Sequence, residues 1–262
     1  MNRQLPPALA FRHAVSSFRN NLSVAFGLSW PWYALVLPAS MVMFLLAGSS
    51  GAGNQGRPTG LMVVATLLVA LITMISAASI AVSWHRYILQ DELSLGAGAA
   101  LRLDGLVWRY FGNVLLISLI LIAAMFIAGL PLILIAAAGG AATLAVMLIF
   151  IIVVPLIGTA FFRLAIKLPA VALGREDFSL KDAWEATRGN TLALFLLFLL
   201  NLLVLVGCVA VLALLQAIFS SLGVFGTIVE LVVQVVLNWV LTIFSITILT
   251  SLYGFFVENR DF

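Results

Sequence analysis

The feature that most constrains this chain is a long stretch without charge. From Tyr110 to Phe162 the sequence contains no Asp, Glu, Lys or Arg. A membrane-spanning helix needs about 20 mostly apolar residues, so this stretch is long enough for two such helices. Over the whole chain 64% of the residues are apolar and 9% are charged, whereas about a quarter are charged in an ordinary soluble domain. A soluble fold cannot bury so much apolar surface, so this chain requires lipid as the solvent for its exterior.

Apolar stretches of sufficient length predict an all-α fold, a polytopic membrane bundle of six transmembrane helices that uses residues 1–262 as one domain. The expected spans are Leu22–Ala47, Leu61–Trp84, Val114–Ala137, Ala141–Phe162, Thr191–Phe219 and Phe225–Tyr253. Gly139-Gly140 is expected to form the turn between the third and fourth spans, and Ser220–Gly223 the turn between the last two. The segment before the first span is too long and polar for a signal-peptide n-region, so that span is predicted to be retained.

The placement of lysine and arginine predicts an orientation. Of the 13 lysines and arginines, all but Arg57 lie in the N-terminal segment, in the linkers after the second and fourth spans, or in the C-terminal tail. The positive-inside rule therefore places both termini and both charged linkers in the cytoplasm, and the location is predicted to be the bacterial inner membrane. The chain has no basic run of the kind that binds nucleic acid. Its single Cys208 excludes an intramolecular disulfide.

The chain also resembles itself three times. Alignment at Asn21, Asn113 and Asn190 makes four apolar positions coincide at i, i+3, i+4 and i+7, the spacing of an amphipathic helix. These positions are Phe11, Leu103 and Leu180; Ala14, Leu106 and Ala183; Val15, Val107 and Trp184; and Phe18, Tyr110 and Thr187. The other face carries Arg12 and Ser16, Asp104 and Trp108, or Lys181 and Glu185. We therefore predict three repeats of an interfacial helix plus a transmembrane hairpin, over about 9–90, 101–167 and 179–257.

Local signals mark the ends of these repeats. Gly112 and Gly189 are expected to let the chain turn from the membrane surface into the bilayer, and Ser179 with Asp182 is typical of a capping box. Interfacial helices of this kind lie in the headgroup plane. They either only brace the bundle, or contact a protein partner at the cytoplasmic face or sense lipid. Trp30, Trp32 and Tyr33 in the first span and Trp84 at the end of the second are partly consistent with interfacial belts, although Trp30 lies deeper and packing is an equal alternative for it.

The exits of two spans are also alike. Trp84-His85-Arg86 and Phe161-Phe162-Arg163 stand 77 residues apart, the same offset that separates Asn113 from Asn190, whereas the third exit, Leu252-Tyr253-Gly254, lacks the arginine. Membrane lipids are the expected partners of these exits. We predict that Arg86 and Arg163, with His85 beside the first, anchor the protein to lipid phosphates.

Two linkers resemble a known family. They are the segment from Arg163 to Gly174 with its continuation from Ser179 to Asn190, and the segment from Trp84 to Glu92. Both are similar to the membrane domain of the glycerophosphoryl diester phosphodiesterase family, a broad group of six-span bacterial membrane proteins. Some relatives carry a fused soluble phosphodiesterase domain. Since the membrane unit takes up all 262 residues here, the resemblance implies the fold and not that enzyme activity.

The sixth span carries a polar stripe. Glu230, Gln234 and Asn238 share one helical face at i, i+4 and i+8, and Asn201 in the fifth span is placed to meet Asn238 across an antiparallel hairpin. An ionisable residue inside a membrane is a functional candidate by default. The stripe is either a polar site for a proton, a cation or a lipid headgroup, or a set of ordinary interhelical hydrogen bonds.

The sequence predicts no metal site, no cofactor and no enzyme. His85 has only His13 as a second histidine, so the ligand count for a metal fails. Catalysis needs a positioned acid, base or metal, and Glu230 stands alone. This favours a non-catalytic inner-membrane protein that scaffolds or regulates partners at the cytoplasmic face. The alternative is a small transporter or lipid-handling protein that uses the stripe of Glu230, and an intramembrane lipid enzyme is the least supported class.

Overall fold

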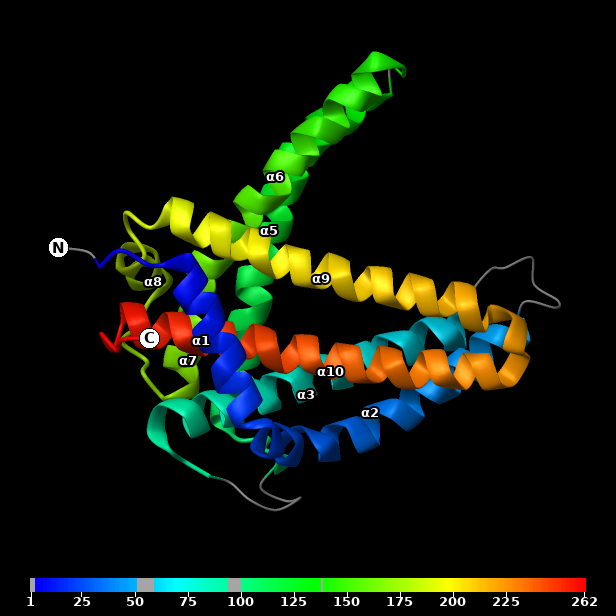
Figure 1. Ribbon diagram of the computed structural model, residues 1–262, viewed down its shortest axis with the longest axis horizontal. Helices are drawn as coiled ribbons and strands as arrows, with labels where there is room; N and C mark the ends of the chain where they lie inside the picture. Colours follow the sequence, from blue (N-terminus) through cyan, green and yellow to red (C-terminus); the bar gives the residue numbers. More distant parts are fainter. Residues whose placement is uncertain (1–2, 51–58, 94–99, 138) are drawn as a thin grey trace. The chain divides into compact units, whose positions relative to one another are not determined.

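The computed structural model of the chain describes residues 3–50, 59–93, 100–137 and 139–262. All regular secondary structure in these residues is helical, which confirms the predicted class. The helices are α1 (Pro7–Asn20), α2 (Leu22–Ser50), α3 (Gly60–Gln90), α5 (Gly105–Ala136), α6 (Ala141–Ala165), α7 (Lys167–Ala172), α8 (Leu180–Ala186), α9 (Thr191–Phe219), the short 3-10 helix η1 (Ser220–Leu222) and α10 (Gly223–Phe256) (Figure 1).

Six stretches are long and apolar enough to cross a membrane. They are Leu22–Val42, Gly60–Gln90, Gly105–Ala136, Ala141–Ala172, Thr191–Phe219 and Phe225–Phe256, and the protein is therefore a multi-pass membrane protein. α10 has 34 residues and is about 51 Å long at 1.5 Å per residue. The hydrocarbon core of a bilayer is about 30 Å thick, so a helix of this length extends beyond the hydrocarbon core.

The two predicted turns between neighbouring spans are confirmed. Gly139 and Gly140 both have positive φ, 76° and 55°, which a glycine adopts without a Cβ penalty. The hydroxyl of Thr143 donates to the Ala136 carbonyl at 3.2 Å and closes this turn, which joins α5 to α6 (Figure 1). At the other turn, η1 leads into Gly223 with φ 56°.

The structure corrects one prediction about the repeats. α5 runs without a break from Gly105 to Ala136, so the chain does not leave the helix at Gly112. A glycine permits a turn but does not force one, and its apolar neighbours extend the same hydrogen-bonded helix. Gly189 does turn the chain, with φ 83°, and α1 and α2 are separate helices with Asn21 between them.

The chain divides into two compact units. One comprises Met1–Asn20, Asn113–Ala170 and Arg175–Phe262, and the other comprises Asn21–Gly112 and Val171–Gly174. Two of the divisions fall beside Asn21 and Asn113, the positions at which the repeat was aligned. A single membrane domain over the whole chain stays a prediction.

In the first unit, α1 packs across the α9–α10 hairpin (Figure 1). Its buried residues are Ala10 and Ala14. Two aromatic pairs flank them: the ring of Phe11 lies edge-on to Phe244, with centroids 5.4 Å apart, and Phe18 lies 5.9 Å from Trp239.

α6 and α9 of the same unit pack at a glycine. A Cβ on Gly158 would lie 2.1 Å from the ring of Phe198, so a larger residue here would force that ring to move, and the glycine lets the two helices pack closely.

In the second unit, α2 packs against α3. The indole of the buried Trp32 donates to the hydroxyl of Ser79 and to the carbonyl of Ala100, each at 3.0 Å. Trp84 is 0% exposed, so it does not contribute to an interfacial belt, with which its position in the sequence was partly consistent. Both indoles are packing residues, because both are buried within the protein.

Burial is concentrated at one end of each returning span. The buried residues of α3 lie from Ser76 to Leu89, most of those of α6 from Pro155 to Ala165, and most of those of α10 from Ile243 to Phe255. We call these three stretches the linker ends, because each leads into a charged linker or the C-terminal tail. The opposite parts of the spans expose mainly apolar side chains, as lipid-facing surface does.

Candidate functional site

Four charged side chains join the linker end of α3 to the start of α5. Nε of Arg86 donates to Oε2 of Glu92 at 2.8 Å, and its Nη2 pairs with the same oxygen. Nη1 of Arg102 donates to Oε1 of Glu92 at 3.3 Å, and its Nε pairs with Asp104. Asp104 in turn accepts from the backbone nitrogens of Leu106 and Val107 at the start of α5. We call Arg86, Glu92, Arg102 and Asp104 the first bracket.

The first bracket lowers the pKa of its central carboxylate, Glu92. The hydrogen bond from Arg86 lowers the pKa of Glu92 below its ordinary value of 4.5; burial opposes this change, and the charges of Arg86 and Arg102 add to the lowering. Arg86 also donates from Nη1 to the carbonyl of Ala172 at 3.2 Å. Its guanidinium thus holds three segments of the second unit together.

His85 lies beside the first bracket, inside the protein. Its side chain is wholly buried. Nε2 lies 3.3 Å from the hydroxyl of Tyr110, and the two ring centroids are 5.8 Å apart. Tyr87, two residues later, donates from its hydroxyl to Oδ1 of Asn21 at 2.7 Å.

Arg163 joins the linker end of α6 to α8. Its Nε donates to the hydroxyl of Thr187 and its Nη2 to the carbonyl of Trp184, both at 3.0 Å. The guanidinium carbon also lies 3.7 Å from the centroid of the Trp184 ring, a cation–π contact. Arg163 is only 9% exposed. We call Arg163, Trp184 and Thr187 the second bracket.

α8 itself is started by the predicted capping box, which is confirmed. The Ser179 hydroxyl accepts from the Asp182 backbone nitrogen at 3.2 Å, and Oδ2 of Asp182 accepts from the Ser179 nitrogen at 2.8 Å. The hydrogen bonds from Ser179 lower the pKa of Asp182. With both ends of this short helix held, the ring of Trp184 has a defined place over Arg163.

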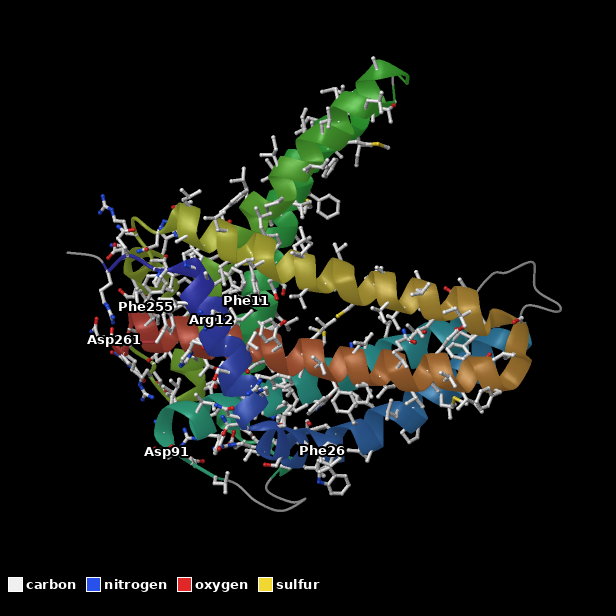
Figure 2. The ribbon with its side chains drawn as sticks, in the orientation of Figure 1. Phe11, Arg12, Phe26, Asp91, Phe255 and Asp261 are labelled. Atoms are coloured by element: carbon white, nitrogen blue, oxygen red, sulfur yellow. The ribbon has the colours of Figure 1, made fainter. Side chains whose placement is uncertain are left out.

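Sequence reasoning missed a third bracket, at the chain termini. Nδ2 of the buried Asn190 donates to the carbonyl of Arg3 at 2.8 Å, and its Oδ1 accepts from the backbone nitrogen of Leu5 at 2.7 Å. Arg3 in turn pairs with Asp261 and donates to the carbonyl of Arg260 at 3.1 Å, beyond the end of α10 (Figure 2). The available signal was the recurrence of asparagine at the three aligned positions.

The structure therefore places the predicted exit residues among protein partners. Arg86 and Arg163, which match in the repeat alignment, each connect the end of a span to the interfacial segment that follows it in the chain. Tyr110 and Thr187, which also match, lie against His85 and Arg163 respectively. The anchoring of Arg86, Arg163 and His85 to lipid phosphates stays a prediction.

The polar stripe of α10 lies on the surface of the described structure. Gln234 and Asn238 are exposed, while Glu230 is partly exposed, as is Asn201 of α9. A stripe sealed between α9 and α10 would count against a polar site. The exposure of these residues shows that the stripe is not sealed there. The meeting of Asn201 with Asn238 stays a prediction.

Comparison with known proteins assigns no role to the residues of this site. No family model, curated protein or solved structure matches the chain. Within the part of the chain that the structure describes, no group of three or more His, Cys, Asp or Glu side chains is arranged to hold a metal ion. The resemblance to the phosphodiesterase membrane domain therefore rests on the two linkers alone. Those linkers contain Arg86 and Glu92 of the first bracket and all of the second.

Proposed function

We propose that the protein is a non-catalytic integral membrane protein that scaffolds or regulates partners at the cytoplasmic face of a bacterial inner membrane. The observation that carries this proposal is the use made of the charged residues at the linker ends. The guanidinium groups of Arg86 and Arg163 hold the interfacial segments in place. These two arginines are thereby engaged in holding a framework of helices.

The bracketed segments present outward faces of different chemistry. Trp108 is exposed on the first turn of α5, and Lys181 with Glu185 on α8. A surface held rigidly before binding loses little conformational entropy when a partner docks, which raises affinity. Fixed, differently charged helix faces beside a membrane are what a scaffold needs.

The test reverses the charges on α8 without changing their sum. Lys181 and Glu185 form an i, i+4 pair at 3.8 Å, so Lys181→Glu with Glu185→Lys keeps the pair and places the acidic residue first, the better order in a helix. Affinity capture of the full chain in mild detergent should lose specific partners several-fold, while the circular dichroism spectrum stays that of the unaltered protein.

Gln234→Leu, on the exposed stripe of α10, is the matched control and should leave capture unchanged. Capture that survives the charge reversal, or that is lost only with Gln234→Leu, would contradict the scaffold proposal.

Loss of capture only in the Gln234→Leu variant would favour the other candidate function, a small transporter or lipid-handling protein. The observation that supports it is the exposure of Gln234 and Asn238 on a helix long and apolar enough to span the bilayer, where polar side chains are costly. Under either function we propose that the chain is related to the phosphodiesterase membrane domain, on the strength of the linker residues that build the brackets.

A further inference from the structure

The outward face of α1 differs from its inner face in both charge and exposure. Successive residues of a helix are about 100° apart, so Leu9, Arg12, Val15, Ser16 and Arg19 share one side. All five are exposed. Ala10 and Ala14, on the opposite side, are buried against the α9–α10 hairpin. We call these five exposed residues the α1 outer face.

The α1 outer face combines aliphatic and basic side chains. Leu9 is 50% and Val15 41% exposed, and they flank Arg12 and Arg19. There is no acidic residue in α1, and the first in the chain is Asp91. Aliphatic side chains beside arginines are the composition with which a helix lies in a bilayer interface and attracts anionic lipid.

The place of α1 in the fold puts this face beside lipid. α1 crosses two helices that are each long and apolar enough to span the membrane (Figure 1). The Nδ1 atom of His13 lies 3.0 Å from the Ser251 hydroxyl, at the linker end of α10. Figure 2 places Phe11 and Arg12 on the stretch of α1 that crosses the hairpin. If the α9–α10 hairpin spans the bilayer, a helix that crosses it at its linker end is expected at one face of the bilayer, where its outer side can meet headgroups.

We propose that the α1 outer face binds the anionic phospholipid headgroups of the leaflet around the α9–α10 hairpin. Arg12 and Arg19 supply the charge, and Leu9 with Val15 enters the boundary of the acyl chains. This assigns lipid binding to arginines that no bracket uses, and it differs from the partner docking proposed for α8.

The repeat provides a matched control. Lys181 stands at the position of Arg12 in the third copy and is also exposed, its side chain 83% accessible. Unlike the arginines of α1, it has an acidic neighbour, Glu185, at 3.8 Å. Removal of the Lys181 charge changes the net charge as much as removal of Arg12 does, but it does not touch the α1 outer face.

The experiment measures which lipid the full chain retains. The protein is equilibrated in mixed micelles with equal amounts of phosphatidylglycerol and phosphatidylcholine, separated from free micelles, and its bound lipids are quantified by mass spectrometry. We expect a preference for phosphatidylglycerol. Arg12→Gln with Arg19→Gln should reduce that preference by about fivefold per arginine, up to about 25-fold for the pair.

Two further variants separate charge from fold. Arg12→Lys with Arg19→Lys should keep the preference, since a lipid phosphate attracts either cation, and Lys181→Gln should change it less than twofold. A preference that survives the double glutamine variant, or that Lys181→Gln abolishes equally, would overturn the proposal.

Salt tests the unaltered protein. The Debye length falls to about 3 Å at 1 M salt, so separation at that ionic strength should remove the preference for phosphatidylglycerol without any substitution. A preference unchanged by salt would also overturn the proposal, because an exposed arginine face cannot bind headgroups without this sensitivity.

Discussion

Arg163 lies where α6 leaves the apolar part of the chain, a place where a cation is expected to meet lipid phosphate. Its guanidinium instead donates to the Thr187 hydroxyl and the Trp184 carbonyl and lies over the Trp184 ring. These three contacts depend on the planar fork of arginine rather than on charge alone. A lysine at this position can keep the attraction to phosphate but cannot reproduce that geometry.

Arg163→Lys therefore separates the two roles of this residue. If Arg163 holds α8, the substitution should lower the free energy of unfolding by about 2 kcal/mol, because hydrogen bonds to a charged group are each worth roughly 1.5–3 kcal/mol. Thermal unfolding in detergent, followed by circular dichroism, measures the loss. Lys181→Arg, at an exposed site, should stay within about 0.5 kcal/mol of the original protein. Equal stability of the two variants would leave lipid anchoring as the better account.

At the scale of helices, the interfacial segments follow a common rule of packing. α8 packs on α6 and α1 packs on α10, while the first turns of α5 meet α3 through Tyr110 and His85. Each segment thus lies on the returning span of the preceding hairpin, and α1 uses the last hairpin of the chain. The threefold repeat stays a prediction, and in its second copy the interfacial segment continues into the span without a turn.

The first bracket predicts a pH dependence for the second unit. Because the folded pKa of Glu92 lies below its ordinary value of 4.5, the folded state binds the proton less readily than the unfolded state. The stabilisation is therefore complete above about pH 4.5 and is lost as the pH falls through the lowered folded pKa. Since Glu92 is about one-third exposed, solvent screening limits the effect to less than about 1 kcal/mol.

Melting temperatures of the full chain between pH 3 and pH 7 measure this loss, and Glu92→Gln should remove part of the acid dependence. Glu176→Gln changes an exposed carboxylate outside the bracket and should leave the acid dependence as it is. Identical pH profiles for the Glu92→Gln variant and the unaltered protein would contradict a stabilising role for the bracket.

At the scale of the whole molecule, burial and charge indicate the same organisation. The buried parts of α3, α6 and α10 are the ends that lead to the charged linkers and the tail, whereas most other parts of the spans expose apolar surface. Within each unit, the buried residues of these spans lie at the linker ends, and the remainder of each span is left to lipid and to packing between spans. Loop charge then decides which side of the membrane the linker ends occupy.

Reporter fusions test that orientation. A reporter that is active only in the cytoplasm should be active when fused within residues 163–190 or after the C-terminus, and inactive when fused at Arg57. Arg57 lies outside the described residues, so the fusion rests on loop charge alone. A paired reporter that is active only outside the cytoplasm should give the reverse pattern at each site. The same compartment for Arg57 and the linker would contradict six crossings.

Sequence alone determined what depends on neighbours along the chain. Six apolar helices, the turn at Gly139-Gly140 and the capping box of Ser179 all follow from residues within a few positions of one another, because lipid solvation, positive φ and end capping are local effects. Only the tertiary structure decided where the side chains at the linker ends go. The guanidinium of Arg163, the indole of Trp84 and the inner face of α1 meet partners brought together by packing, which no pattern of spacing specifies. Gly112 shows the same limit, since a residue that allows a turn makes one only where the surrounding fold demands it.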